Sequence, residues 1–214
     1  DYIYAGDLYG NMWRIDVTAS APSAWRVLGK GGPSSRDPIF SAVDDNGNPQ
    51  PITARPEATI TSAGGLMLYF GTGQYLQISD ITDYNVQSFY GLLDNPVQDK
   101  QPPFRSNVVT RASMSESRVI NETTFGAEGV RQFTNDAADT YMNWYLDLVS
   151  PNTAPAGERV IGPAIARGHT RKSIIFTSII PSQDVCDFGG RSWLIELDAR
   201  NGNQTSTPVF DLNY

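Results

Sequence analysis

Pairs of aspartates three residues apart are the clearest candidates for acid–base or metal chemistry in this chain. They stand at Asp80 with Asp83, Asp136 with Asp139, and Asp184 with Asp187. A glycosidase needs two carboxylates that face each other across a sugar, and spacing in sequence does not establish that geometry. Residues 79–85 are also dense in oxygen atoms that a cation can use. A turn capped by an acid explains the same pattern, and we favour that interpretation.

A second oxygen-rich stretch resembles the start of a calcium loop. Asp44, Asn46 and Asn48 alternate as the first ligands of such a loop do. However, Gly47 stands at the fourth position where the loop needs glycine at the sixth, and Arg55 occupies the place of the bidentate glutamate. The segment therefore predicts a plain Asn-Gly turn.

Other catalytic arrangements are incomplete. The only histidine, His169, stands in a polar stretch where an exposed position is the default, and no Gly-x-Ser-x-Gly elbow occurs. Residues 71–76 begin like a dinucleotide fingerprint but lack its third glycine. The single cysteine, Cys186, is either buried and reduced or paired with a thiol outside these residues. We expect a protein that is not an enzyme.

Charge and hydropathy limit the partners. The net charge is −7, with 16 basic and 23 acidic residues. No run of Lys and Arg is present to neutralise phosphates, so we expect no nucleic acid partner. The basic cluster at residues 167–172 is interpreted as a solvated turn. No stretch approaches the roughly 20 apolar residues of a membrane span.

The elements that must position these side chains are strands. In residues 1–16 two apolar runs flank a turn between Gly6 and Gly10, which predicts a β-hairpin. Nineteen Gly and 14 Pro are scattered between short apolar runs, which favours an all-β fold. Because the hairpin begins at residue 1, we expect the chain to be a piece of a longer protein that starts in the middle of a structural unit.

A three-strand unit recurs along the chain. Its copies are residues 51–60, 66–73 and 87–94, then residues 159–166, 173–178 and 190–198, with a degenerate copy at residues 130–133 and 142–147. The opening hairpin supplies the last two parts of a further copy. Four strands end in an acid, at Asp16, Asp94, Asp147 and Asp198. Radial stacking of such units predicts a partial β-propeller of about four blades or blade parts.

Two local expectations follow from that architecture. The strand-ending acids should accept hydrogen bonds in the turn to the next blade. Residues 95–128 are polar with little periodicity, so they are interpreted as a long excursion that contains one strand near residues 108–111.

Four segments carry a family resemblance. Residues 1–16 closely resemble a segment of the PilY family of type IV pilus tip-associated biogenesis factors and adhesins, and residues 71–76, 87–94 and 186–198 support the likeness in the family's order. The resemblance implies that residues 1–214 are the C-terminal half of a modified β-propeller domain. It also implies a non-enzymatic, extracellular role at the pilus tip, in surface adhesion and in promoting pilus extension over retraction.

The resemblance implies partners and a metal as well. The partners would be minor pilins or other pilus components, and a host or abiotic surface. The family binds calcium in an Asp-rich loop directly before the opening hairpin, and only the last acid of that loop maps here, onto Asp1. Calcium takes about six to eight oxygen ligands, so the others would lie outside these residues. The family's Arg-Gly-Asp motif is absent, and residues 167–169 do not replace it.

Two other functions remain open. Residues 197–202 have a weaker likeness to quinoprotein propellers, so a quinoprotein dehydrogenase-like enzyme is one alternative. The other is a propeller scaffold that binds proteins without adhesion.

Overall fold

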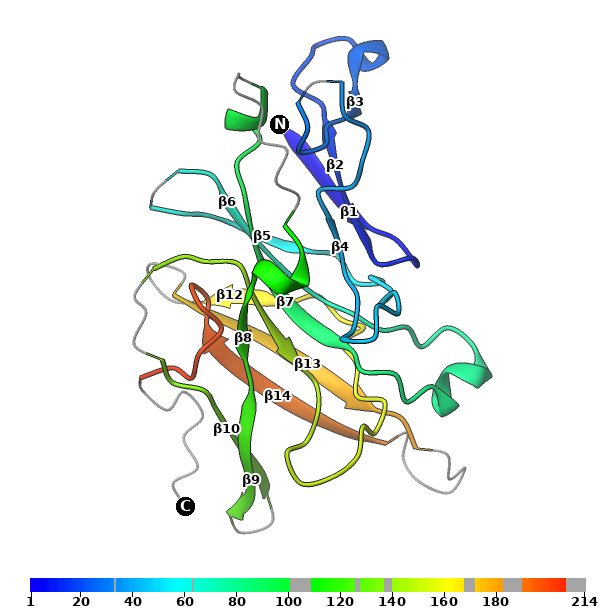
Figure 1. Cartoon of the computed structure of the whole chain (residues 1–214), viewed down its shortest axis with the longest axis vertical. Coiled ribbons are helices and arrows are strands. Elements are labelled where there is room, and N and C mark those ends of the chain that lie inside the picture. The colour runs from blue at the N-terminus through cyan, green and yellow to red at the C-terminus, as the bar shows by residue number, and fades with distance from the viewer. Residues whose placement is uncertain are drawn as a thin grey trace.

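The computed structural model describes residues 1–32, 34–62, 64–100, 109–125, 128–136, 140–167, 172–182 and 190–206. These residues form strands in four sheets, together with four short 3-10 helices (Figure 1). The helices are η1 (Pro22–Ala24), η2 (Ile78–Thr82), η3 (Gln98–Lys100) and η4 (Arg111–Ser113). Within this part of the chain no helix has the length and apolar character to span a membrane.

The N-terminal sheet contains the expected hairpin. Strands β1 (Tyr2–Gly6) and β2 (Asn11–Asp16) pair antiparallel, and β3 (Arg26–Val27) and β4 (Phe40–Ser41) both pair with β2. The turn forms because Asp7 accepts hydrogen bonds from the backbone N–H groups of Tyr9 and Asn11, and because Gly10 adopts a φ of 82°. A side chain at Gly10 would also collide with the carbonyl oxygen of Ala42, at 2.6 Å.

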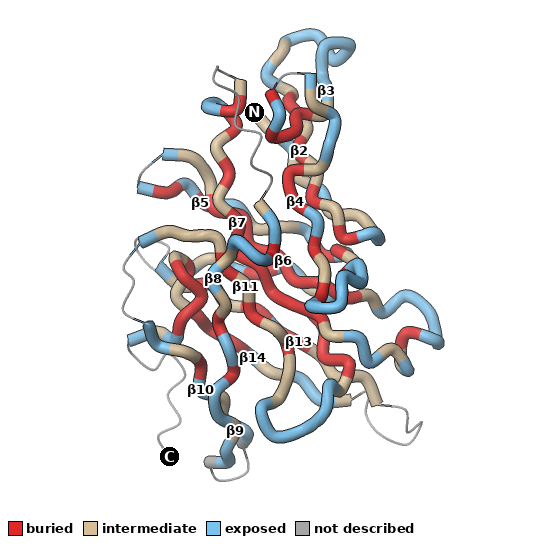
Figure 2. Tube along the Cα trace, in the orientation of Figure 1, coloured by how far each residue is buried: buried red, intermediate tan, exposed pale blue. Residues whose placement is uncertain are grey.

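The central sheet has five strands in the order β5-β6-β7-β11-β8. They are β5 (Glu57–Ile60), β6 (Leu66–Gly71), β7 (Ser88–Asp94), β11 (Trp144–Asp147) and β8 (Ser115–Ser117). Only β8 and β11 pair in parallel among the described pairings of this sheet. Strands β6 and β7 are buried along almost their whole length, which Figure 2 shows as the red centre of the molecule.

The C-terminal sheet and a two-stranded ribbon complete the fold. The sheet has the order β12-β13-β14, with β12 (Ile165–Arg167), β13 (Ser173–Ile180) and β14 (Arg191–Asp198). The ribbon pairs β9 (Val119–Phe125) with β10 (Glu128–Phe133). The proposed degenerate copy is therefore divided, because β10 belongs to the ribbon whereas β11 pairs with β7 in the central sheet.

Strand alternation explains why the central sheet is buried on both faces. Side chains point alternately to opposite faces of a strand. Met67 and Tyr69 lie in the core shared with the C-terminal sheet, whereas Leu68 and Phe70 lie in the core shared with the N-terminal sheet. The three sheets thus stack face to face, with a separate apolar core in each interface.

Aromatic contacts join the sheets across these two cores. Phe89 of β7 stacks on Phe176 of β13, with ring centroids 3.8 Å apart and planes within 4°. On the opposite face, Tyr90 packs edge-to-face on Phe40 of β4 at 5.1 Å. Such pairs contribute about 0.5–1.5 kcal/mol beyond the area they bury.

The interpretation of residues 95–128 as one excursion with a strand near residues 108–111 is wrong. Arg111 begins η4, and the segment contains β8 and the polar strand β9. Most side chains of β9 are exposed because its ribbon has only one partner strand, so no apolar alternation marks it in the sequence. Residue 108 lies outside the described residues.

Candidate functional site

The carboxylate of Asp80 caps a turn, as we expected. It is buried and accepts hydrogen bonds from the backbone N–H groups of Leu76 and Gln77 at 2.7 and 3.0 Å, and from the side-chain amide of Gln74 at 2.9 Å. Burial raises the pKa of Asp80, but these hydrogen bonds outweigh burial and hold the pKa below its usual range. Asp83 accepts from Asn85 in the same loop. The pair is an element of loop structure.

The Asp44 segment is the predicted Asn-Gly turn. Asp44 accepts hydrogen bonds from the backbone N–H groups of Asn46 and Asn48 and from the Asn48 amide, and Gly47 has a φ of 82°. Burial raises the pKa of Asp44, but the hydrogen bonds lower it further, so the carboxylate stays charged.

The four strand-ending acids divide into two kinds. Asp16 accepts from the backbone N–H and hydroxyl of Thr18, and Asp198 accepts from the backbone N–H of Arg200, so both cap the following turn as predicted. Asp16 also binds the distant Lys100 at 2.7 Å. The prediction is wrong for Asp94 and Asp147. Their carboxylates bind cationic side chains from distant segments, because they point into the boundaries between stacked elements.

Asp94 is the centre of a buried ionic cluster. Its carboxylate binds Arg14, Lys30 and the hydroxyl of Tyr4, and Arg14 also binds Asp99. Burial raises the pKa of Asp94, but Lys30 and Arg14 outweigh it and keep the pKa below its ordinary value. Burial and the nearby Asp94 charge raise the pKa of Tyr4, so its hydroxyl remains a donor. The side chains of Arg14 and Asp94 have no exposed surface, so this cluster joins two sheets.

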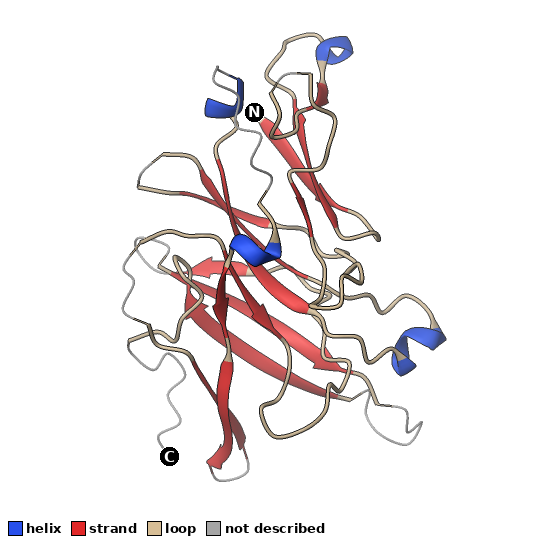
Figure 3. Ribbon diagram, in the orientation of Figure 1, coloured by secondary structure: helices blue, strands red, loops and turns tan. Residues whose placement is uncertain are grey.

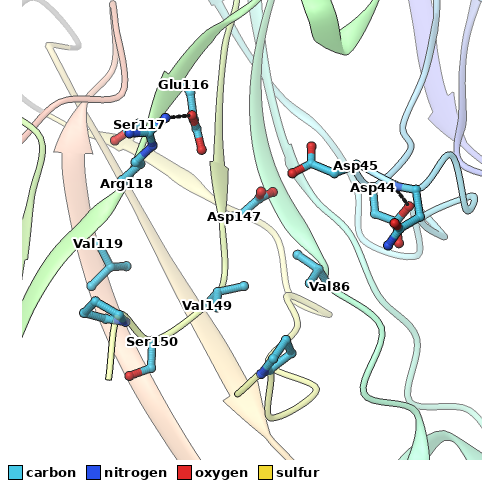
Figure 4. A pocket seen from close by; sticks show the side chains of 13 residues that line it. Asp44, Asp45, Val86, Glu116, Ser117, Arg118, Val119, Asp147, Val149 and Ser150 are labelled. Atoms are coloured by element: carbon cyan, nitrogen blue, oxygen red, sulfur yellow. Dashed lines mark hydrogen bonds and ion pairs between the residues drawn. The ribbon is translucent and has the colours of Figure 1, made fainter. Parts of the chain in front are cut away.

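Asp147 lies at the edge of an open pocket of about 380 Å³ (Figure 4). The pocket lies between the Asp44 turn of the N-terminal part of the chain, the start of β7, and the ends of β8 and β11. Its walls carry the carboxylates of Asp44, Asp45, Glu116 and Asp147, the side chain of Arg118, and the apolar groups of Val86, Val119, Val149, Pro151 and Pro155.

Arg111 binds two of the carboxylates that line the pocket. Its guanidinium binds Asp147 and the Oδ1 atom of Asp45, at 2.9 Å from Nε, and stacks on the ring of Tyr145 at 3.8 Å. Arg111 and Arg118 supply two positive charges against the four carboxylates, because Arg111 binds Asp45 and Asp147 and Arg118 binds Glu116. The described lining therefore keeps a net negative charge, which attracts a cationic side chain. The described residues contain no group of three His, Cys, Asp or Glu placed to hold a metal ion.

Asp1 lies exposed immediately before β1. Its backbone carbonyl accepts a hydrogen bond from the N–H of Val17 at 3.2 Å. The described residues contain no group of three or more His, Cys, Asp or Glu side chains that could hold a metal ion. By themselves they therefore do not fit the calcium site that the family resemblance implies.

Other predicted positions lie outside the described residues. These are His169, Cys186, Asp139, Asp184 and Asp187. Sequence reasoning missed three buried arginines that organise the interior, Arg14, Arg111 and Arg159. Arginine is mostly exposed in proteins, so its residue type does not by itself mark these three as buried.

The stacked, mainly antiparallel sheets are those of a β-propeller. Residues 1–123 match the family model described as the PilY1 beta-propeller domain, and the chain belongs to this family. It is 31% identical over 215 residues to a Type IV pilus biogenesis factor PilY1 homolog of Xylella fastidiosa, covering 100% of this chain and 16% of the relative. It is 30% identical over 243 residues to the Type IV pilus biogenesis factor PilY1 of Pseudomonas aeruginosa PAO1, covering 99% of this chain and 20% of the relative.

A solved structure agrees with these matches. The crystal structure of the Pseudomonas aeruginosa PilY1 C-terminal domain superposes with a TM-score of 0.81 and 28% identity, over 99% of this chain and 46% of that chain. The PilY resemblance and the all-β, partial-propeller fold are thereby confirmed. The chain spans only about a sixth to a fifth of the length of these two curated relatives.

Proposed function

We propose that this chain is part of a non-enzymatic type IV pilus biogenesis protein. It would act outside the cell at the pilus tip, promote extension over retraction, and attach the pilus to a host or abiotic surface. The observation that carries the proposal is the match of residues 1–123 to the PilY1 propeller family, together with relatives named as pilus biogenesis factors.

The carboxylates of Asp44, Asp80 and Asp94 bind groups within the chain, which supports a structural role. Asp80 and Asp44 are saturated by hydrogen bonds within their turns, and Asp94 is neutralised by Arg14 and Lys30. A general acid or base needs a titratable group that reaches substrate with a pKa near the working pH. The lowered pKa values of these carboxyl groups favour a scaffold over catalysis.

Complementation tests the role in biogenesis. A strain without the protein receives the full-length protein with or without residues 1–214, and surface pili are counted in retracting and retraction-deficient backgrounds. We expect the shortened protein to give few pili and poor twitching motility, with pili restored when retraction is blocked. Full piliation by the shortened protein would contradict the proposal.

Tip location and adhesion need separate measurements. Gold-labelled antibody against this segment should mark pilus ends, and the purified full-length protein should bind host cells or an abiotic surface. Binding to minor pilins without attachment to any surface would instead favour the scaffold function. A quinone absorption band in the purified protein would favour the enzyme.

Calcium modulation is the final part of the proposal. Asp1 would be the last ligand, with the remaining oxygens supplied by residues outside this chain, since a single carboxylate cannot complete a calcium shell. Bound calcium would stiffen the opening hairpin, because a ligand that binds only the folded state stabilises it.

A further inference from the structure

A loop between β6 and β7 exposes unusually large apolar side chains. The exposed fractions are 41% for Tyr75, 69% for Leu76 and 87% for Ile78. Figures 1 and 3 show this loop, with η2 at its end, extending away from the stacked sheets. Apolar surface gathered on one projecting segment commonly marks an interaction site, whereas single exposed apolar residues do not.

The side chain of Asp80 holds the backbone of this loop by hydrogen bonds. The buried carboxylate accepts from the N–H groups of Leu76 and Gln77, the residues that flank or carry the exposed apolar groups. The loop therefore folds around an ionised side chain and turns its apolar side chains outward.

Arg159 fixes the same loop from the neighbouring sheet. It is buried, and its backbone exchanges both hydrogen bonds with Ile179 of β13. Its guanidinium donates to the carbonyl oxygens of Gln74 and Asp80, each at 2.7 Å, and of Asp83 at 2.6 Å. Two buried charged groups thus hold a segment that exposes most of the side chains of Leu76 and Ile78.

The hydrogen bonds that hold the loop lower the free-energy cost of binding a partner. Ordering a loop upon association costs free energy, and a loop that is already ordered avoids most of that cost. Tyrosine is enriched among the residues that dominate protein–protein affinity. The loop therefore has the properties of a preorganised anchor.

The acidic side chains near the loop indicate the charge of the partner. Residues 74–86 contain no Lys or Arg. Val86, at the end of the loop, lines the pocket that carries Asp45, Glu116 and Asp147. An anionic lipid surface would be repelled by this region, and a second copy of the chain would bring the same net charge of −7.

We infer that the loop of residues 74–84 and the acid-lined pocket at its base form one docking surface for a protein. The partner presents an apolar groove for Leu76 and Ile78 and a lysine or arginine that enters the pocket. The inference rests on the proposed function in one respect, which is that the partner is a pilus subunit.

Titration of the full-length protein with purified soluble domains of the major and minor pilins of the same organism tests the inference. The double substitution Leu76→Ser with Ile78→Ser should weaken one of these interactions about 10- to 30-fold. Ile60→Ser is the matched control, because Ile60 is 78% exposed on β5. It should change the dissociation constant less than about twofold. Asp45→Asn should slow association and reduce its salt dependence.

Several results would overturn the inference. If the double variant binds pilin as tightly as the wild type and still supports piliation, the docking surface is wrong but the proposed function stands. If the wild-type protein binds no pilin and residues 1–214 are dispensable for piliation, both fail.

Three further measurements examine other occupants. Binding to phosphatidylcholine or phosphatidylglycerol vesicles that the double substitution abolishes would identify a membrane. A concentration-dependent dimer in sedimentation that it abolishes would identify self-association. Finally, if maleimide does not label the thiol introduced by Ile78→Cys in the full-length protein, another part of that protein covers the loop. Each of these results contradicts a pilin partner, and ready labelling supports it.

Discussion

Arg14 and Asp94 form a fully buried ion pair between two sheets, although 80 positions separate them in the chain. The Nη1 atom of Arg14 lies 2.7 Å from Oδ1 of Asp94, and its Nε donates to the carbonyl oxygen of Leu28. Removing two charges from water is costly, and this arrangement offsets the cost because Lys30 and Tyr4 also bind the same carboxylate. The N-terminal and central sheets are therefore held in one relative position.

We predict that Asp94→Asn strongly destabilises the protein. Removing one partner leaves Arg14 and Lys30 as buried cations without sufficient compensation, which costs about 3–5 kcal/mol. Urea denaturation should show this loss in the free energy of unfolding. Arg118→Gln is the control, because it breaks an exposed ion pair with Glu116 and should leave the midpoint unchanged. Similar midpoints for both variants would argue against the role of the cluster.

Gly157→Ala should loosen the loop of residues 74–84. Gly157 has a φ of 70°, and a Cβ atom there would lie 2.4 Å from the carbonyl oxygen of Asp83 and 2.9 Å from Nη2 of Arg159. The left-handed backbone alone costs alanine about 1–2 kcal/mol. Hydrogen exchange should become faster at the amides of Leu76 and Gln77. Gly162→Ala, which meets no atom within 4 Å, should leave those amides protected.

The stability of the protein should fall in acid, and Asp80 should account for part of the decrease. Because the folded-state pKa of Asp80 is below its unfolded value of about 3.9, this group stabilises the protein fully above that pH. Its contribution is lost as the pH falls through the folded pKa. The free energy of unfolding, measured between pH 5 and pH 2.5, should therefore decline less steeply in Asp80→Asn. An identical slope in the variant would show that Asp80 is not a linked group.

Calcium should stabilise only a protein that includes residues preceding Asp1. The 214-residue chain should show no shift in melting temperature on calcium titration, since Asp1 alone cannot hold the ion. The longer protein should melt at higher temperature with calcium, and Asp1→Ala should reduce that increase. A comparable shift in the 214-residue chain would place the site elsewhere.

The sequence predicts those elements whose causes are local. The opening hairpin follows from Asp7 and Gly10, which form its turn, and the Asp44 turn follows from the same chemistry. Strands β6 and β7 are apolar because both of their faces are buried, and this makes them visible as continuous runs. In contrast, β9 is polar and exposed, so its existence depends on its pairing with β10.

The candidate site was harder to predict from the sequence, because it depends on tertiary contacts between distant segments. Nothing near Asp147 in the chain shows that Arg111 will bind it, and the pocket arises where four separate segments meet. The acids at Asp94 and Asp16 end similar strands and both are buried, yet Asp94 binds Arg14 from another sheet whereas Asp16 caps a turn and binds Lys100. Only the stacking of the sheets distinguishes them.

The hydrogen bonds of Arg159 have a consequence for how this surface can change. The acceptors that its guanidinium reaches in the loop are main-chain oxygens of Gln74, Asp80 and Asp83, and every residue type carries such an oxygen. Substitutions at the outward-facing positions can therefore accumulate while the shape of the loop is preserved. Related pilus proteins could alter which partner they recognise by exchanging these side chains alone, much as antibodies vary their loops on a constant framework.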